Sequence, residues 1–444
     1  MDRISMFSAE FRPTLRQRGV YYVRMLVISL FAIWVPLCLF YGAVYKRTSF
    51  AHLIRLAIVN FDNGPVGSTV TQALLLQNQP SNHTRPLWQQ RNGFGSDHDV
   101  SEWVRTDGWA ALVIHSNASR QLELALAGGA EAYNPDNAMT LFVSTGRQPI
   151  IYSLVIASAT ASDLGIATNA FAVKMVQEIQ SGSIGIAGAS NLQTAAAAAV
   201  LLTQPVSYRQ IDVAPLTFNI APLSNLFGFL AGMFCTIGPM MGWKMASFPF
   251  YLKVRHRDLW IGAVGLLLAW TTLMGMYAAL ALSAFRGPGY SENALRYTAG
   301  RFFSLWSTAT ATLLAVALWL FSWYALLTPE LLGLASVTTL LPNIVSTISV
   351  AELAPHFYRW MHALPFYNGA MLYRYILSGA YPRIGANLGI ILGEICAMSL
   401  VLGAVMYVRQ MMVLLGTGDA PGWIRGNLFF STPVPYYKKD KATS

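Results

Sequence analysis

The chain has 444 residues, of which 54% are hydrophobic and only 11% are charged, and its mean hydropathy is +0.44. Soluble domains carry about 25% charged residues, so this composition excludes an ordinary soluble protein and indicates an integral membrane protein. The formal charge of +10 is spread over the expected membrane boundaries. The sequence contains no continuous basic face with aromatic residues, so it gives no indication of nucleic-acid binding.

The first predicted elements are a basic N-terminal segment and a long apolar helix. Residues 1–19 are expected in the cytoplasm, and residues 20–45 are expected to form a permanent transmembrane helix. The apolar run is too long for the core of a cleaved signal peptide, and it lacks a small-residue cleavage site. The arginines before and at the start of this helix outnumber the basic residues beyond it, which puts the N-terminus in the cytoplasm.

Residues 46–221 are predicted to form an extracytoplasmic α/β domain between the first and second membrane helices. Hydrophobic periodicity and turn signals predict its elements in the following order: a strand at 56–61, a helix at 66–78, a polar excursion loop at 79–104, a strand at 109–115, a helix at 116–128, a strand at 139–144, helices at 150–180 and 193–202, and a strand at 206–213. Asp163 and other charged residues interrupt the apolar helix at 150–180, so we expect this helix outside the membrane. Asn82 and Asn117 open two sequons and are candidate glycosylation sites on the same side.

Five further apolar runs are each long enough to cross a bilayer. They are residues 222–243, 259–285, 303–327, 331–352 and 384–408. Together with the first run, they predict a polytopic α-helical membrane protein with six transmembrane helices and the α/β domain inserted between helices 1 and 2. Within the transmembrane domain 222–408, the segment 353–383 is aromatic, basic and broken by prolines, so it is predicted to lie at the outer interface. Residues 409–444 are expected to be a cytoplasmic tail.

Glu394 is the most unusual residue of the predicted membrane helices. It falls near the middle of the last helix, where even gentle insertion scales put the cost of an acidic residue at about 3 kcal/mol. The carboxyl group is therefore expected to be protonated, paired or in contact with water. Two interpretations stay open, namely a substrate or proton contact in a translocation path and an interhelical hydrogen bond. Asn343, which follows Pro342, is likewise either a cavity-lining residue or part of a structural kink.

Glycines at four-residue spacing mark two of the predicted membrane helices. They are Gly228, Gly232, Gly238 and Gly242 in the second helix and Gly385, Gly389 and Gly393 in the last. Such faces allow close approach of another helix and indicate helix packing or dimerisation more often than a binding site. We therefore expect a homodimer.

The predicted interfacial segment contains three arginines. Arg359, Arg374 and Arg383 are expected to anchor it at the headgroups of membrane lipids, with an anionic ligand as the alternative.

The sequence lacks the motifs that would indicate catalysis or a resident cofactor. No P-loop, GxSxG or HExxH motif is present, and none of the seven histidines pairs with Cys, Asp or Glu at metal-binding spacing. The three cysteines lie in apolar runs and provide no disulfide framework. We therefore expect neither an enzyme nor a bound metal or cofactor.

Four stretches of the chain carry a family resemblance. They are LAIVNFDNGPVGSTV (56–70), GWAALVIHSNASRQLELALAGG (108–129), TLFVSTGRQPIIY (140–152) and LPFYNGAMLYRYILSGAY (364–381). With the predicted topology, they resemble the fungal nitrosoguanidine-resistance family, which is related to the membrane domains of type-2 ABC exporters and to the bacterial phage-infection-protein group. The resemblance extends over nearly the whole chain, although its motifs are topological and not catalytic.

The resemblance implies a plasma-membrane or endomembrane protein that confers resistance to toxic small molecules, by export or by altering lipid arrangement. In a fungal setting, it also implies self-protection against a secondary metabolite. Type-2 exporters need a nucleotide-binding subunit, and none is fused here, so a separate energising subunit is unidentified. The alternatives are a lipid translocator that alters bilayer asymmetry and a non-transporting scaffold or receptor that uses its external domain.

Overall fold

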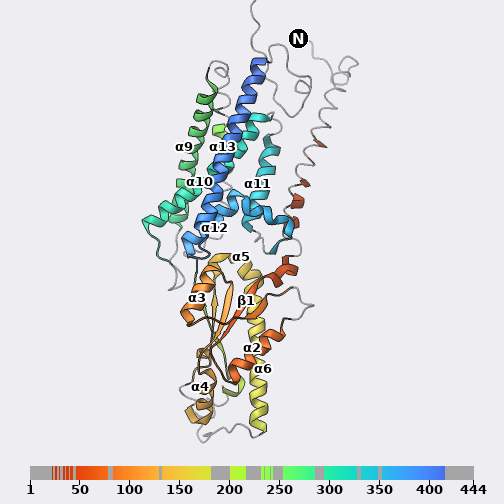
Figure 1. Cartoon of the computed structure of the whole chain (residues 1–444), viewed down its shortest axis with the longest axis vertical. Coiled ribbons are helices and arrows are strands. Elements are labelled where there is room, and N and C mark those ends of the chain that lie inside the picture. The colour runs from red at the N-terminus through yellow and green to blue at the C-terminus, as the bar shows by residue number, and fades with distance from the viewer. Residues whose placement is uncertain are drawn as a thin grey trace, which may run out of the picture.

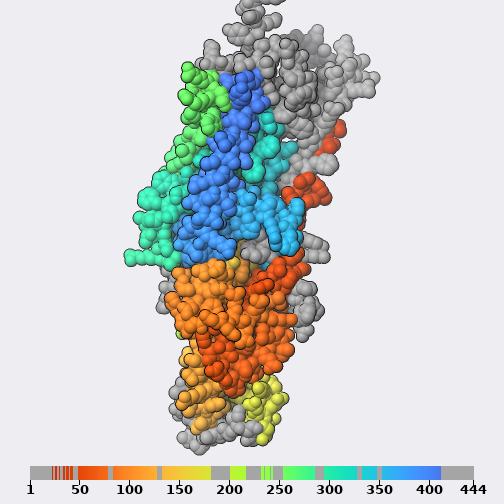
Figure 2. Space-filling model, in the orientation of Figure 1, coloured from red at the N-terminus to blue at the C-terminus, as the bar shows by residue number. Residues whose placement is uncertain are grey.

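The computed structural model describes most of the chain between residues 23 and 415. The described residues are 47–78, 84–129, 133–181, 201–216, 254–285, 295–327, 332–348 and 353–415, with part of 23–43 and part of 232–243. In these residues the protein is mostly helical and contains one five-stranded sheet. A sheet domain forms one end of an elongated molecule, and long helices form the other end (Figure 1 and Figure 2).

The sheet domain has a mixed sheet with helices on both faces. The strand order is β2-β1-β3-β4-β5, and only the β3–β4 pair is antiparallel. Helices α2 and α6 pack on one face, where alternate residues of the strands form the larger core, and α3 packs on the other face. The strands are β1 (Arg55–Asn60), β2 (Leu87–Gln90), β3 (Ala110–Ile114), β4 (Met139–Val143) and β5 (Tyr208–Asp212), and the main helices are α2 (Pro65–Leu76), α3 (Asp97–Thr106), α4 (Ala118–Leu124), α5 (Pro149–Ile151) and α6 (Ala157–Gln180).

The predicted excursion loop at 79–104 is wrong in part, because the segment contains β2 and most of α3. Strand β2 is a short edge strand in which Trp88 alone is fully buried, so its sequence shows little hydrophobic alternation. Helix α3 buries only Val100 and Val104, which are four residues apart on one face of an otherwise polar helix. Ser96 caps the helix by accepting a hydrogen bond from the backbone N–H of Asp99. Because β2 and α3 are mostly polar, hydrophobic periodicity did not predict either of them.

The other end of the molecule is built around helix α10. This helix packs against α9, α11, α12 and α13 and buries most of its surface. Indole N–H groups tie the helices together, because Trp260 of α9 donates to the carbonyl of Ser399 at 2.9 Å and Trp306 of α10 donates to that of Thr272 at 2.8 Å. The elements are α9 (His256–Ala284), α10 (Ala299–Leu326), α11 (Leu332–Ile348), the 3-10 helix η10 (His356–Ala363), α12 (Pro365–Ser378) and α13 (Ile384–Leu415).

Four helices in the described part of the chain are long and apolar enough to cross a membrane. They are Pro149–Gln180, His256–Ala284, Ala299–Leu326 and Ile384–Met411. The last three coincide with predicted membrane helices. The predicted helix at 331–352 corresponds to α11, which has 17 residues and contains Pro342. The described positions between 23 and 43 and between 232 and 243 are helical, and the rest of the first and second predicted helices lies outside the described residues.

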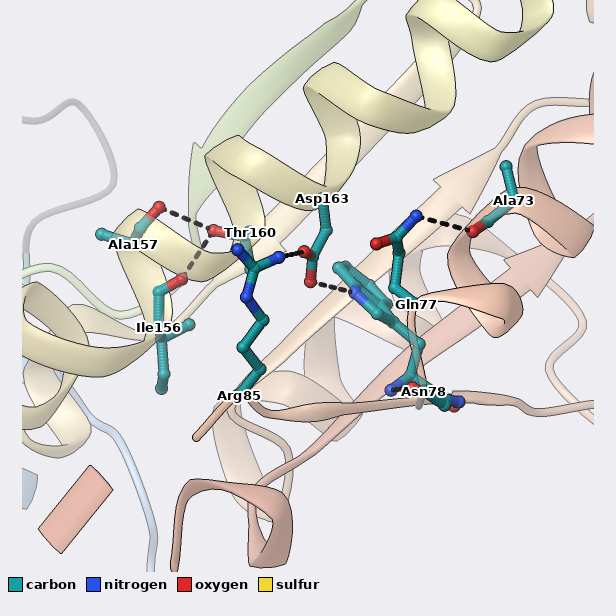
Figure 3. Close-up of polar contacts among 9 residues, drawn as sticks. Ala73, Gln77, Asn78, Arg85, Ile156, Ala157, Thr160 and Asp163 are labelled. Atoms are coloured by element: carbon teal, nitrogen blue, oxygen red, sulfur yellow. Dashed lines mark hydrogen bonds and ion pairs between the residues drawn. The ribbon is translucent and has the colours of Figure 1, made fainter. Parts of the chain in front are cut away.

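The contacts of α6 place it in the sheet domain. Leu164, Phe171 and Met175 belong to the same core as the strands and α2. Asp163 is almost completely buried, and its carboxylate accepts hydrogen bonds from Arg85 at 2.8 Å and from the indole N–H of Trp88 at 3.0 Å (Figure 3). Part of the apolar surface that makes this helix resemble a membrane span is thus packed in the core of the sheet domain, whereas Ile166 and Val173 are exposed.

Candidate functional site

The first candidate site is Glu394, the carboxylic acid of α13. One turn of this helix, Ile391 to Ile395, packs against Ala315 of α10 and Leu372 of α12. Glu394 lies at the margin of this contact and is half-buried. Its Oε2 atom is enclosed and has no hydrogen-bond partner in the part of the chain that the structure describes. Because an enclosed polar atom without a partner costs free energy, this oxygen is a candidate acceptor for a bound molecule.

Asn387 extends the polar surface of α13 toward the sheet domain. It is seven residues before Glu394, which puts the two side chains on the same face of the helix, about 10 Å apart along its axis. Asn387 is buried, with 7% of its surface exposed. Asn387 was not predicted from the sequence, although its seven-residue spacing from Glu394 is a signal that could have identified it.

The second candidate site is the junction between the sheet domain and the helices. The carbonyl of Thr347, at the end of α11, accepts hydrogen bonds from Arg374 of α12 at 2.9 Å and from Gln148 of the sheet domain at 3.3 Å. The last carbonyls of a helix carry partial negative charge and lack intrahelical partners. They therefore suit a guanidinium group, and both parts of the protein meet at this one atom.

Arg374 differs from the other two arginines of the predicted interfacial segment. Its side chain is buried, and no carboxylate of the described residues pairs with it. Arg359 and Arg383 are exposed, and Arg383 stacks on the ring of Tyr381 at 4.5 Å. The expectation of a common headgroup anchor therefore does not describe Arg374, because it lies between α11, α12 and the sheet domain.

A second arginine, Arg147, joins the sheet domain to the end of α12. Its guanidinium lies 4.4 Å from the ring centre of Trp109 and 4.6 Å from that of Tyr381, and it donates to the carbonyls of Asp107 and Gly108. The backbone N–H of Tyr381 donates to the carbonyl of Arg105 at 2.9 Å. Tyr381 has a φ of 54°, a left-handed conformation that is uncommon for an aromatic residue. The contacts with Arg147 and Arg105 thus hold Tyr381 in this strained conformation.

Asn343 is fully buried in α11, and its amide forms hydrogen bonds at both ends. Its Oδ1 accepts from the backbone N–H of Phe366 at 3.2 Å, and its Nδ2 donates to the carbonyl of Thr339 at 2.9 Å. The side chain therefore connects the helix that contains Pro342 to the start of α12. This arrangement supports the structural-kink interpretation.

The predicted glycine faces have different surroundings. A Cβ atom on Gly232 would lie 2.7 Å from Leu313, so this glycine permits close approach to α10. The three predicted glycines of α13 face open space, as do two of the second helix; they are Gly385, Gly389, Gly393, Gly238 and Gly242. Gly228 lies outside the described residues. The glycine face of α13 therefore contacts no other described element of this chain.

The two sequons are placed only in part. Asn117 is exposed at the N-terminus of α4 and adopts a left-handed backbone conformation with a φ of 64°. Asn82 lies outside the described residues. In those residues no cluster of three or more His, Cys, Asp or Glu side chains is placed to hold a metal ion.

Comparison with known proteins identifies one family. The family described as "Protein of unknown function (DUF3533)" matches residues 25–400, which include the sheet domain, the junction and Glu394. The chain belongs to this family. No curated protein and no solved structure matches the chain. The family match therefore extends over both the sheet domain and the helices. The hydrogen bonds to the carbonyl of Thr347 also connect these two parts.

Proposed function

We propose that the protein is a membrane translocator that exports toxic small molecules and thereby confers resistance to them. The observation that carries this proposal is the enclosed Oε2 atom of Glu394, which has no partner among the described residues. Ionisable groups inside membrane helices are costly and mark substrate or ion pathways by default. Asn387 lies on the same face of α13 and provides a second polar contact along the path.

Basic residues support the orientation that we propose for the protein. Helix α9 begins, and α13 ends, at the end of the helices away from the sheet domain (Figure 1). Arg255 and Arg257 lie at the start of α9, and Arg409 lies near the end of α13. Because Lys and Arg favour the cytoplasmic side, the sheet domain is external in this proposal, in the plasma membrane or an endomembrane.

The sheet domain in this proposal moves with the helices that contact the substrate. Gly146, in the loop after β4, has no room for a Cβ atom between Ser378 of α12 and the carbonyl of Ala214. Thr347 is held from both sides of the same junction. A displacement of the sheet domain would therefore move α12, whose Leu372 contacts the turn of α13 that precedes Glu394.

The test is an efflux assay with matched variants. Cells that express the wild type, Glu394→Gln, Glu394→Ala or Asn387→Ala are loaded with rhodamine 6G, and loss of the dye is followed. Cys396→Ala is the control, because Cys396 is exposed and only two residues from Glu394. We expect export to be lost in Glu394→Ala and reduced in Asn387→Ala at unchanged protein level. Normal export by Glu394→Gln would show that the site needs a hydrogen-bonding group and not an ionisable one.

A fluorescent phosphatidylcholine, scored for dithionite accessibility in the same cells, separates two kinds of transport. Unchanged dye export with an altered lipid distribution would replace export by lipid translocation. If neither readout depends on the protein, translocation is refuted, and a scaffold or receptor role becomes the better account. Loss of the protein in Glu394→Ala would instead assign Glu394 to helix packing.

A further inference from the structure

A pocket of about 480 Å³ lies on the sheet domain, away from both sites described above. Its walls include Asn60, the last residue of β1, and Gln90, the last residue of β2. Helix α2 supplies the opposite wall with Ser68, Thr71 and Leu75. Because β1 and β2 are parallel neighbours, the pocket lies at the carboxyl ends of parallel strands, where open α/β sheets bind ligands.

Thr71 is the most buried polar residue in the wall of this pocket. Its side chain is 7% exposed, and its Oγ1 atom is buried without a hydrogen-bond partner. Buried hydroxyl groups nearly always have partners, and Thr168 on α6 shows the usual solution, since its hydroxyl donates to the carbonyl of Leu164 at 2.9 Å. A ligand that enters between α2 and the ends of β1 and β2 would open access to this hydroxyl and supply the partner that it lacks.

Asn60 presents a second unused polar group. Its Oδ1 accepts a hydrogen bond from the backbone N–H of Asp62 at 2.9 Å, whereas its Nδ2 has no partner among the described residues. The amide lies against Gly67 of α2, where a Cβ atom would collide with it. The glycine therefore leaves the space in which the Asn60 amide reaches the pocket.

The charge around the pocket disfavours an anionic ligand. The N-terminus of α2 would ordinarily attract a phosphate, but the carboxylate of Asp62 already occupies it. Asp62 is 4% exposed and accepts hydrogen bonds from the backbone N–H of Gly67 at 3.0 Å and from the hydroxyl of Ser119 at 2.6 Å. Ser119 in turn accepts from the backbone N–H of Val66 at 2.9 Å. The chain thus supplies its own anion at this position.

We propose that this pocket binds a neutral sugar, as a monosaccharide or disaccharide. Three side-chain amides, two hydroxyls and two leucines line it, and none of the lining residues is charged. Amides and hydroxyls match the donor and acceptor hydroxyls of a sugar, and Leu75 provides an apolar wall for the C–H face of the ring. The inference concerns the sheet domain and does not depend on translocation by the membrane helices.

The test measures sugar binding by the full chain in lipid nanodiscs free of sugar detergents. Saturation-transfer difference NMR is recorded with glucose, mannose, N-acetylglucosamine and maltose, and inorganic phosphate is added as a competitor. The variants are Thr71→Val, which removes the unpartnered hydroxyl without a change of shape, and Gln90→Ala. Gln89→Ala is the matched control, because successive residues of a strand point to opposite faces.

We expect at least one of these sugars to bind, without competition from phosphate. Each variant should weaken it about fivefold, as the loss of one neutral hydrogen bond predicts. Gln89→Ala should bind within twofold of the wild type, and Thr71→Val should unfold at the same temperature as the wild type or higher. Absence of saturation transfer from all four sugars would overturn the proposal. Equal binding by the wild type and by Thr71→Val and Gln90→Ala would also overturn it, because the sugar would then bind elsewhere.

Discussion

Replacement of Asp163 by Leu gives the sharpest test of where α6 lies. Composition alone makes Pro149–Gln180 a candidate membrane span, whereas its contacts place it on the sheet. In the sheet domain, Asp163→Leu leaves the buried indole N–H of Trp88 without an acceptor, which costs about 1–3 kcal/mol. It also removes the partner of Arg85, whose side chain is 37% exposed, so this pair adds no more than about 1 kcal/mol. The expected loss is therefore about 1–4 kcal/mol.

Hydrogen–deuterium exchange on the full chain in nanodiscs measures this loss locally. A loss of 2 kcal/mol corresponds to exchange about 30-fold faster in peptides that cover β2 and the middle of α6. Glu178→Gln on the same helix is the control, because its contact with Lys174 is a long, exposed pair at 4.0 Å and is worth less than about 0.5 kcal/mol.

The opposite result would refute the placement of α6 in the sheet domain. If Pro149–Gln180 crossed the bilayer, replacement of a central Asp by Leu would favour the inserted helix by about 3 kcal/mol. Exchange in this segment would then become slower. Exchange within twofold of the wild type would show that the contacts of Asp163 with Arg85 and Trp88 do not hold α6 against the sheet.

Three further predictions concern the junction, the pH response and self-association. Gly146→Ala should destabilise the junction by about 1–3 kcal/mol through overpacking. Gly165→Ala, in open space on α6, should instead stabilise the protein by about 0.5–1 kcal/mol. Thermal unfolding measures the direction of both changes, and equal shifts of the unfolding temperature would contradict the close contact of Gly146 with Ser378 and Ala214. Burial raises the pKa of Asp212 above its ordinary value of 3.8. Asp212 therefore contributes fully to the free energy of unfolding below pH 3.8, and this contribution is lost as the pH rises through the raised pKa. Thermal unfolding measured from below pH 3.8 to above the raised pKa should show this loss of stability in the wild type and not in Asp212→Asn. If a second copy covers the glycine face of α13, Gly389→Leu should abolish chemical crosslinking between copies at unchanged thermal stability. In contrast, Gly275→Leu should destabilise the single chain, because the Cβ of residue 275 would lie 2.6 Å from Thr310. Crosslinking that survives Gly389→Leu would exclude this face as the interface.

Local sequence determined the membrane class of the protein and most of its elements. Long apolar runs identify α9, α10 and α13, because a helix that crosses a bilayer needs about 20 consecutive, predominantly apolar residues. Strand β1 and helix α2 were predicted within two residues, since a buried strand, a turn with glycine and proline, and a helix start follow each other directly in the sequence. In these segments one short stretch of chain contains the whole signal.

Tertiary structure alone decided the roles of the polar residues. Arg374 and Arg383 look alike in the sequence, yet one is buried against the end of α11 and the other is exposed on Tyr381. Asp163 finds its partners about 75 residues earlier in the chain. Thr71 lies in the wall of a pocket, and its buried hydroxyl has no hydrogen-bond partner among the described residues. Burial and hydrogen-bond partners depend on segments that are distant in sequence, so the composition around a residue does not determine them.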